Sequence, residues 1–292
     1  MLTEHGMTLE RIGTELHCSG KLTGGEFEIA GNVSSQFISG LLFALPLLNT
    51  DSTLTVTGKL ESSAYIAMTE NALRRSGIEF AKNDNVYAIP GNQRYRLNEA
   101  CTVEGDLSNA AFFLCMGALS DKGVTVKNIP EHTSQGDKKI IDILRSFGAD
   151  VAVNGDSVAV KKGRLTACTV DASEIPDLVP VVSVVAAAAE GDTHIINAAR
   201  VRLKESDRLM TTATLLCSLG ASVEELPDGL IIHGGRPLHG GTIDSFNDHR
   251  IAMSAAVAAC VCTEPVTVTG CECVNKSFPR FWENFSGLEC GQ

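Results

Sequence analysis

The sequence lacks any apolar run long enough to cross a membrane. Its longest runs, at 37–48 and 179–189, fall short of the roughly 20 residues that a spanning helix needs, and Pro46 interrupts the first. The first six residues show neither the basic nor the apolar part of a secretory leader. We therefore expect a cytoplasmic protein with no membrane partner.

A basic surplus is also missing. Lys and Arg number 24 against 35 Asp and Glu, so the formal net charge is −11. A general affinity for nucleic acid needs a broad basic surface, so we expect no nucleic-acid partner. An anionic small molecule would have to be bound by locally grouped cations.

The ten cysteines show no convincing metal spacing. Cys260 and Cys262 are separated by one residue, as are Cys271 and Cys273, whereas zinc sites usually use C-x-x-C. Several other cysteines fall at apolar positions of helical patterns, where a thiol packs as a small hydrophobe. We expect reduced thiols and no metal, with a zinc site as the less favoured alternative.

The chain is long enough for two domains, and its pattern repeats about every 71 residues. Following this period closely, a small polar or acidic residue opens an apolar helical pattern at Asn32, Asp106, Asp177 and Asp248. β-branched strand patterns follow at 53–57, 124–126, 193–196 and 265–269. With a second helix and a turn-linked strand pair, the unit is helix–strand–helix–strand–strand.

Glycines close the second helix of each unit. Gly77, Gly148 and Gly220 follow amphipathic patterns at the same period, as expected of helix C-caps. Gly6 lies one full period before Gly77. The period therefore predicts that the chain starts in the last turn of a helix and that earlier units are missing through an N-terminal truncation. A naturally short start is the alternative.

Two charged runs precede apolar helical patterns, at 202–208 (RLKESDR) and 247–250 (NDHR). Helix N-termini favour anions because their N–H groups are unpaired. Lys204, Arg208 and Arg250 add positive charge there. These runs predict a site for a small phosphate or carboxylate ligand, in which Glu205 could neutralise charge or move a proton.

Six stretches together resemble the enolpyruvyl-transferase family, and in particular its 5-enolpyruvylshikimate-3-phosphate synthases. They are 31–37 (GNVSSQF), 134–137 (SQGD), 175–177 (IPD), 202–208 (RLKESDR), 247–250 (NDHR) and 276–279 (KSFP). The resemblance implies an α/β (α+β) fold in which repeated βαβαββ-type units form two lobes. It places 1–103 in an incomplete first lobe on the shikimate-phosphate side and 104–292 in the second lobe, on the phosphoenolpyruvate and catalytic side.

The implied reaction transfers the enolpyruvyl group of phosphoenolpyruvate to the 5-hydroxyl of shikimate 3-phosphate and releases phosphate. It belongs to the shikimate pathway of aromatic amino-acid biosynthesis and needs no metal or redox cofactor. The two phosphorylated molecules are the expected partners. We expect the full-length protein to be a monomer.

The resemblance also implies residue roles, each with a plainer alternative. Asp177 would accept the 5-hydroxyl proton, although an acidic residue at a helix start is ordinarily an N-cap. Glu205 would donate a proton to the methylene, with Lys204 assisting beside it. Without the resemblance, Glu205 and Arg208 would be interpreted as a solvated i,i+3 ion pair, and Lys204 and Arg208, four apart, would share a helix face.

Substrate contacts are implied for both lobes. Arg208, Arg250 and Lys276 would hold phosphoenolpyruvate. His249, between Asp248 and Arg250, is at least as well explained as a packed structural residue. The shikimate-phosphate contacts would come from Ser34, Ser35, Gln36 and Ser62, with Tyr65 near them. Simple helix capping is the alternative for the serines, and Arg200 is assigned no contact.

Two other functions stay open. The UDP-N-acetylglucosamine enolpyruvyl transferases share the fold and the phosphoenolpyruvate chemistry, but the paired KESDR and NDHR runs disfavour them. A folded, self-associating but inactive fragment is the alternative from another class, because the resemblance assigns further cationic substrate contacts to positions before Met1.

Overall fold

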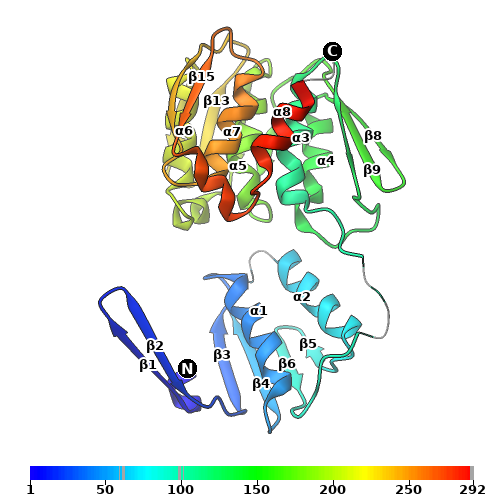
Figure 1. The fold of residues 1–292 in the computed structure, drawn as a ribbon, viewed down its shortest axis with the longest axis vertical. Coiled ribbons are helices and arrows are strands. Elements are labelled where there is room, and N and C mark those ends of the chain that lie inside the picture. The colour runs from blue at the N-terminus through cyan, green and yellow to red at the C-terminus, as the bar shows by residue number, and fades with distance from the viewer. Residues whose placement is uncertain (59, 61–62, 98–99, 101, 290–292) are drawn as a thin grey trace. The chain divides into compact units, whose positions relative to one another are not determined.

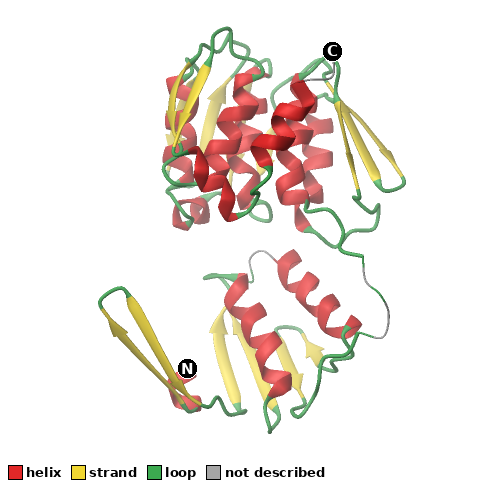
Figure 2. Cartoon of the chain, viewed as in Figure 1, coloured by secondary structure: helices red, strands yellow, loops and turns green. Residues whose placement is uncertain are grey.

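The computed structural model describes residues 1–58, 60, 63–97, 100 and 102–289. The chain divides into two compact units, Met1–Val103 and Glu104–Gln292, called here the first and second unit (Figure 1). Helices and strands alternate in both units (Figure 2), and the predicted α/β class is confirmed. No described helix is long and apolar enough to span a membrane.

The first unit combines a hairpin with a four-stranded sheet. The hairpin follows the 3₁₀ turn η1 (Leu2–His5) and consists of β1 (Met7–Ile12) and β2 (Glu15–Gly20). The sheet has the order β3-β4-β6-β5, with a parallel β3–β4 pair. Its members and the two helices are β3 (Glu26–Ala30), α1 (Ser35–Ala44), β4 (Ser52–Thr57), α2 (Ser63–Arg75), β5 (Ala81–Asn83) and β6 (Val86–Ile89).

The second unit contains three sheets, ordered β7-β9-β8, β10-β11-β13-β12 and β14-β15. Its strands are β7 (Val124–Lys127), β8 (Asp150–Asn154), β9 (Ser157–Lys161), β10 (Thr169–Asp171), β11 (Asp192–Ile196), β12 (Ser222–Leu226), β13 (Gly229–His233), β14 (Gly241–Asp244) and β15 (Val266–Thr269). Its α-helices are α3 (Leu107–Leu119), α4 (Lys139–Ser146), α5 (Val179–Ala188), α6 (Arg208–Ser218), α7 (His249–Ala259) and α8 (Phe281–Glu289).

The repeated unit is clear in the strand pairing. Strands β3 and β4 flank α1, β10 and β11 flank α5, and β14 and β15 flank α7, and each of these pairs is parallel. Gly77, Gly148 and Gly220 have φ values of 73°, 91° and 89°, so the predicted left-handed helix ends are confirmed. Gly6, at 89°, closes η1 in the same way.

Three helices of the second unit are buried almost throughout. The sequences of α3, α5 and α7 are apolar on nearly every side, which is typical of a helix enclosed by other elements. They pack against one another, and α6 packs against α5 and α7. This core is separate from the smaller core of the first unit. Long-range packing of these helices fixes where their N-termini lie.

Two predicted helix starts were misplaced. The apolar helix predicted to open at Asn32 begins at Ser35, because Ser34 is extended and its Oγ accepts a hydrogen bond from the Gln36 N–H. The run at 202–208 is not one helical stretch. Residues Ala199–Leu203 form the 3₁₀ turn η5, and α6 begins only at Arg208, where Asp207 caps it. Lys204 therefore shares no helix face with Arg208.

Candidate active site

Seven charged side chains of the second unit meet at the starts of its buried helices. They form a charged cluster consisting of Asp177, Lys204, Glu205, Arg208, Asp248, Arg250 and Lys276. Asp177 lies in the 3₁₀ turn η4 (Pro176–Leu178) just before α5, and Asp248 is the N-cap of α7. Residues far apart in sequence thus converge, as the charged runs predicted for a local cationic site.

Arg208 is the centre of this cluster. Its side chain is only 1% exposed and pairs with three carboxylates. Nε and NH2 donate to Asp248 at 2.8 and 3.2 Å, and NH1 donates to Asp177 at 2.7 Å. NH2 also donates to Glu205. The predicted Glu205–Arg208 pair is present, but it is not the solvated surface pair of the plainer interpretation.

Asp177 lies among three cations. Its carboxylate is 3.2 Å from Lys204 Nζ, 2.7 Å from Arg208 NH1 and 3.5 Å from Arg250 NH2. Burial alone would raise the pKa of Asp177, but the charges of Arg250, Lys204 and Arg208 outweigh it and hold the pKa well below its ordinary value. Neither η4 nor α5 has a side-chain cap, so the capping interpretation of Asp177 is wrong.

Glu205 bridges Arg208 and Lys276. Its side chain is 30% exposed and that of Lys276 is 55% exposed, so this end of the cluster faces solvent. Burial raises the pKa of Glu205, but the hydrogen bond from Lys276 and the charge of Arg208 lower it overall to about 2. Glu205 is therefore ionised near neutral pH while these two cations remain beside it.

Arg250 is held from two sides. NH2 donates to Ser108 Oγ at 2.7 Å, and NH1 donates to the main-chain oxygen of Asp177 at 3.2 Å. Ser108 belongs to the first turn of α3. The side chain of Gln135 fixes that turn, accepting from the Leu107 N–H and donating to the Gly105 carbonyl, both at 2.8 Å. The SQGD stretch thus orients a residue that the sequence did not single out.

His249 is a buried neutral residue. Its Nδ1 has no hydrogen-bond partner among the described residues. Burial and the neighbouring charge of Arg250 lower the pKa of His249 to about 4. This environment agrees with the interpretation of His249 as a packed structural residue, because a neutral imidazole near pH 7 has no extra proton to donate.

The remaining predicted residues belong to the first unit. Ser34 caps α1, Ser35 is buried and Gln36 is exposed. Ser62 lies outside the described residues. Their contact with the shikimate phosphate stays a prediction. The sequence indicates only weakly that Ser108 and Asp248 belong to the site. Each is a small or acidic residue at a helix start, where capping is the commoner role.

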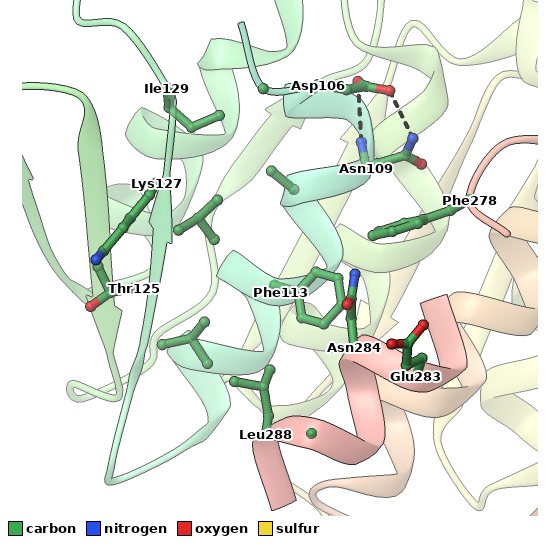
Figure 3. A pocket seen from close by; sticks show the side chains of 15 residues that line it. Asp106, Asn109, Phe113, Thr125, Lys127, Ile129, Phe278, Glu283, Asn284 and Leu288 are labelled. Carbon is green, nitrogen blue, oxygen red and sulfur yellow. Dashed lines mark hydrogen bonds between the residues drawn. The ribbon is translucent and has the colours of Figure 1, made fainter. Parts of the chain in front are cut away.

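An apolar cavity of about 840 Å³ lies elsewhere in the second unit, between α3, β7 and α8 (Figure 3). Phe113, Ile129, Phe278 and Leu288 are among its lining residues, and it contains none of the charged cluster. Binding of phosphate and carboxylate groups requires grouped cations, so this cavity does not suit an anionic ligand of that kind. The charged cluster, which groups four cations, is the better candidate site.

No group of three or more His, Cys, Asp and Glu side chains suited to a metal occurs among the described residues. The eight cysteines that the structure describes form no disulfide with one another. The charged cluster supplies two partly accessible carboxylates and several cations, which are groups for proton transfer and for binding anions.

The repeated unit together with this cluster places the chain among the enolpyruvyl transferases. The structure resembles EPSP synthase from Acinetobacter baumannii with a TM-score of 0.80 and 26% identity, covering 98% of this chain and 68% of that one. It also resembles the fold of the enolpyruvyl transferase NikO from Streptomyces tendae, with a TM-score of 0.75 and 18% identity, covering 98% of this chain and 69% of that one.

Residues 2–285 match the family model described as EPSP synthase (3-phosphoshikimate 1-carboxyvinyltransferase), and the chain belongs to that family. Proteins named 3-phosphoshikimate 1-carboxyvinyltransferase from Clostridium novyi and Clostridium acetobutylicum are 46% and 48% identical over 271 and 274 residues. These matches cover 92% and 94% of this chain. The chain spans only 62% and 63% of the length of those relatives.

Proposed function

We propose that the chain carries the phosphoenolpyruvate-binding and proton-transfer groups of a 3-phosphoshikimate 1-carboxyvinyltransferase. The reaction transfers an enolpyruvyl group to the 5-hydroxyl of shikimate 3-phosphate in the cytoplasm, as a step of aromatic amino-acid biosynthesis. The observation that carries the proposal is the convergence of Asp177 and Glu205 with four cations in one cluster.

The chemistry requires an acid, a base and anion-binding groups. A proton adds to the methylene carbon of phosphoenolpyruvate, and the neighbouring carbon gains cationic character. The 5-hydroxyl oxygen bonds to that carbon and loses its proton. The tetrahedral intermediate then gives up a methyl proton and expels phosphate, which restores the enol double bond. Each proton movement needs a titratable group within hydrogen-bond reach.

Asp177 is the proposed base toward the 5-hydroxyl. It is ionised while its cationic neighbours lie beside it, and it is therefore able to accept a proton. Lys204, 3.2 Å from its carboxylate, is the proposed contact to the phosphosugar. When a substrate anion draws Lys204 or Arg250 away, the pKa of Asp177 rises and its basicity increases.

Glu205 is the proposed acid toward the methylene carbon, and it must gain a proton before it can donate one. Lys276 and Arg208 hold its pKa at about 2 while they lie beside it. The carboxylate and phosphate of phosphoenolpyruvate would compete for these cations. Their withdrawal from Glu205 raises its pKa, so substrate binding itself prepares the acid.

Arg208, Arg250 and Lys276 are the proposed phosphoenolpyruvate ligands. The exposed Lys276 can reorient with little loss of packing, whereas the buried Arg208 keeps its pairing with Asp248. In the first unit, the proposed ligands of the sugar phosphate are Ser34, Ser35 and Gln36 at the start of α1, together with Ser62.

We test the proposal with conservative variants of the two carboxylates. Glu205→Gln and Asp177→Asn should keep phosphoenolpyruvate affinity within a few-fold and lower turnover by about 10²- to 10⁴-fold, because each removes one proton-transfer group. Arg250→Ala should instead weaken binding by about 10- to 100-fold, through loss of charged hydrogen bonds. Titration calorimetry gives the affinities, and a coupled phosphate-release assay gives the rates.

The length of the relatives favours a second possibility, an inactive fragment that still binds ligand. Phosphoenolpyruvate binding without phosphate release by the chain alone, with release restored by adding the N-terminal third of a relative, would support it. Wild-type turnover by either carboxylate variant would remove that residue from the mechanism. Unchanged phosphoenolpyruvate affinity in Arg250→Ala would remove the charged cluster from the binding site.

A further inference from the structure

The segment that carries Lys204 and Glu205 is a loop with little apolar packing of its own. It connects β11 to α6, and after the 3₁₀ turn η5 its residues 204–206 form neither helix nor strand. Val201 in η5 is buried, whereas Leu203 is 85% exposed. Apolar contacts therefore anchor the beginning of the loop but not the part that bears Lys204 and Glu205.

Arg202 attaches this loop to the hairpin β12–β13. Its Nε donates to the Pro227 carbonyl at 3.0 Å, and NH2 donates to the Leu226 carbonyl at 2.7 Å. NH1 donates to the Glu225 carboxylate at 2.7 Å. One side chain thus binds three successive residues at the end of β12, the edge strand of a four-stranded sheet.

Arg202 also closes the loop on itself. NH1 donates to the Asp207 carboxylate at 2.8 Å, and the other oxygen of that carboxylate accepts the Met210 N–H as the cap of α6. Next to this pair, Ser206 Oγ donates to Asp248 at 2.9 Å. The ends of the loop at 202 and 207 are therefore joined, with the two charged residues held between them.

This set of contacts suits the shape of an arginine. A guanidinium is planar and carries five N–H donors in a fixed fork, so it can bind carboxylates and carbonyls in several directions at once. The side chain of Arg202 is 26% exposed and donates four hydrogen bonds of 2.7–3.0 Å. A lysine would keep the charge, but its single nitrogen cannot reach all four acceptors. The anchoring therefore depends on the fork and not on the charge alone.

We propose that Arg202 is a positioning residue that holds Lys204 and Glu205 in the charged cluster, an inference that rests on the proposed function. Lys204 Nζ lies 3.2 Å from the Asp177 carboxylate, and Glu205 bridges two cations. The four acceptors of Arg202 lie outside the charged cluster. Arg202 thus acts on the reaction only through the loop that it anchors.

Loss of this anchor should impair turnover more than phosphoenolpyruvate binding, because the proposed ligands Arg208, Arg250 and Lys276 lie outside the loop. Phosphate release is measured with the N-terminal third of a relative added if the chain alone is inactive. Arg202→Lys should lower kcat about 10- to 100-fold, as expected when a reacting group is misplaced by about 1 Å. The KM for phosphoenolpyruvate should change by no more than a few-fold. A protein that is merely destabilised would keep its kcat per folded molecule.

Amine labelling tests the position of Lys204 without any substrate. Limiting acetic anhydride followed by tandem mass spectrometry gives the acetylation rate of Lys204 relative to the exposed Lys162 of the same unit. Arg202→Lys should raise this ratio about 2- to 10-fold, the range that corresponds to the net loss of one hydrogen bond. The matched control is Arg164→Lys, the same substitution at an arginine whose side chain is 85% exposed, and it should leave the ratio unchanged.

Glu225→Ala keeps the experiment decisive if Arg202→Lys does not fold. Glu225 is an exposed residue of β12, and its loss should raise Lys204 acetylation by a smaller factor. Unchanged Lys204 acetylation in the folded variants overturns the proposal, as does an equal rise in Arg164→Lys. Wild-type kcat in Arg202→Lys also overturns it where Glu205→Gln lowers kcat. If Glu205→Gln keeps wild-type turnover while Lys204 acetylation rises in Arg202→Lys, the anchoring is supported and the proposed function alone is overturned.

Discussion

At the scale of single residues, the ionisation of the carboxylates in the charged cluster depends on which groups pair with each cation. Asp177 and Glu205 are both ionised because Arg208, Arg250, Lys204 and Lys276 outweigh the effect of burial. The same cations are the proposed ligands of substrate anions. Binding and proton transfer are therefore coupled through shared partners, and residues that orient a cation should affect affinity.

Ser108 tests this coupling. Ser108→Ala removes the hydroxyl that accepts from Arg250 NH2 at 2.7 Å and should weaken phosphoenolpyruvate binding about 2- to 10-fold, the range expected for one hydrogen bond. Ser108→Thr should restore most of the affinity. Ser120→Ala, at the other end of α3, is the matched control and should bind normally. Calorimetric titration measures all three, and normal affinity in Ser108→Ala would contradict the orienting role.

His249 should make stability depend on pH. Its folded-state pKa is about 4 against an ordinary 6.5, so the unfolded chain takes up a proton first as the pH falls. Its contribution to stability is complete above pH 6.5 and is lost as the pH falls toward about 4, with a total of about 3 kcal/mol. In urea unfolding, His249→Gln should lose less unfolding free energy than wild type as the pH falls across this range. His132→Gln, on an exposed loop, should behave as wild type.

At the scale of elements, the helix starts were the most predictable part of the site. Asp106 and Asp248 were expected to open helices, and both accept capping hydrogen bonds there. Asn32 and Asp177 follow the same spacing but cap nothing, because Ser34 caps α1 and the carboxylate of Asp177 pairs with cations. Local spacing therefore located the helices, but it could not assign each polar residue its partner.

The two capping aspartates should differ in their effect on stability. Asp106→Ala removes a cap and should lower the free energy of unfolding by about 1 kcal/mol. Asp248→Ala also leaves the buried Arg208 without its paired carboxylate and should cost about 3 kcal/mol or more. Denaturant unfolding of the second unit measures both. Equal losses would mean that the Asp248–Arg208 pair adds nothing beyond the cap.

At the scale of the whole molecule, the chain has two separate hydrophobic cores. The core of the second unit is much the larger, and its helices are buried on nearly all sides. Stability should therefore be divided between two cooperative units, with the first unit unfolding more readily.

This division predicts two unfolding transitions. Leu54→Ala, in the core of the first unit, should lower the free energy of unfolding of that unit alone, by about 2–5 kcal/mol. Leu216→Ala, in the core of the second unit, should lower only the free energy of unfolding of the second unit, by a similar amount. Calorimetry combined with the fluorescence of Trp282, which reports on the second unit, distinguishes them. A single transition shifted by both variants would contradict the division.

The fold class was indicated by resemblance to a known family, whereas the sequence by itself determined the repeat, the turns between paired strands and the glycines that end the helices. These features depend on hydrophobic period and backbone preference, which act over a few residues. Only the tertiary structure decided that Arg208 is buried among three carboxylates and that Ser108 holds Arg250. The Arg208–Asp248 and Arg250–Ser108 contacts join residues 40 and 142 positions apart, and such pairings follow from how the helices pack together.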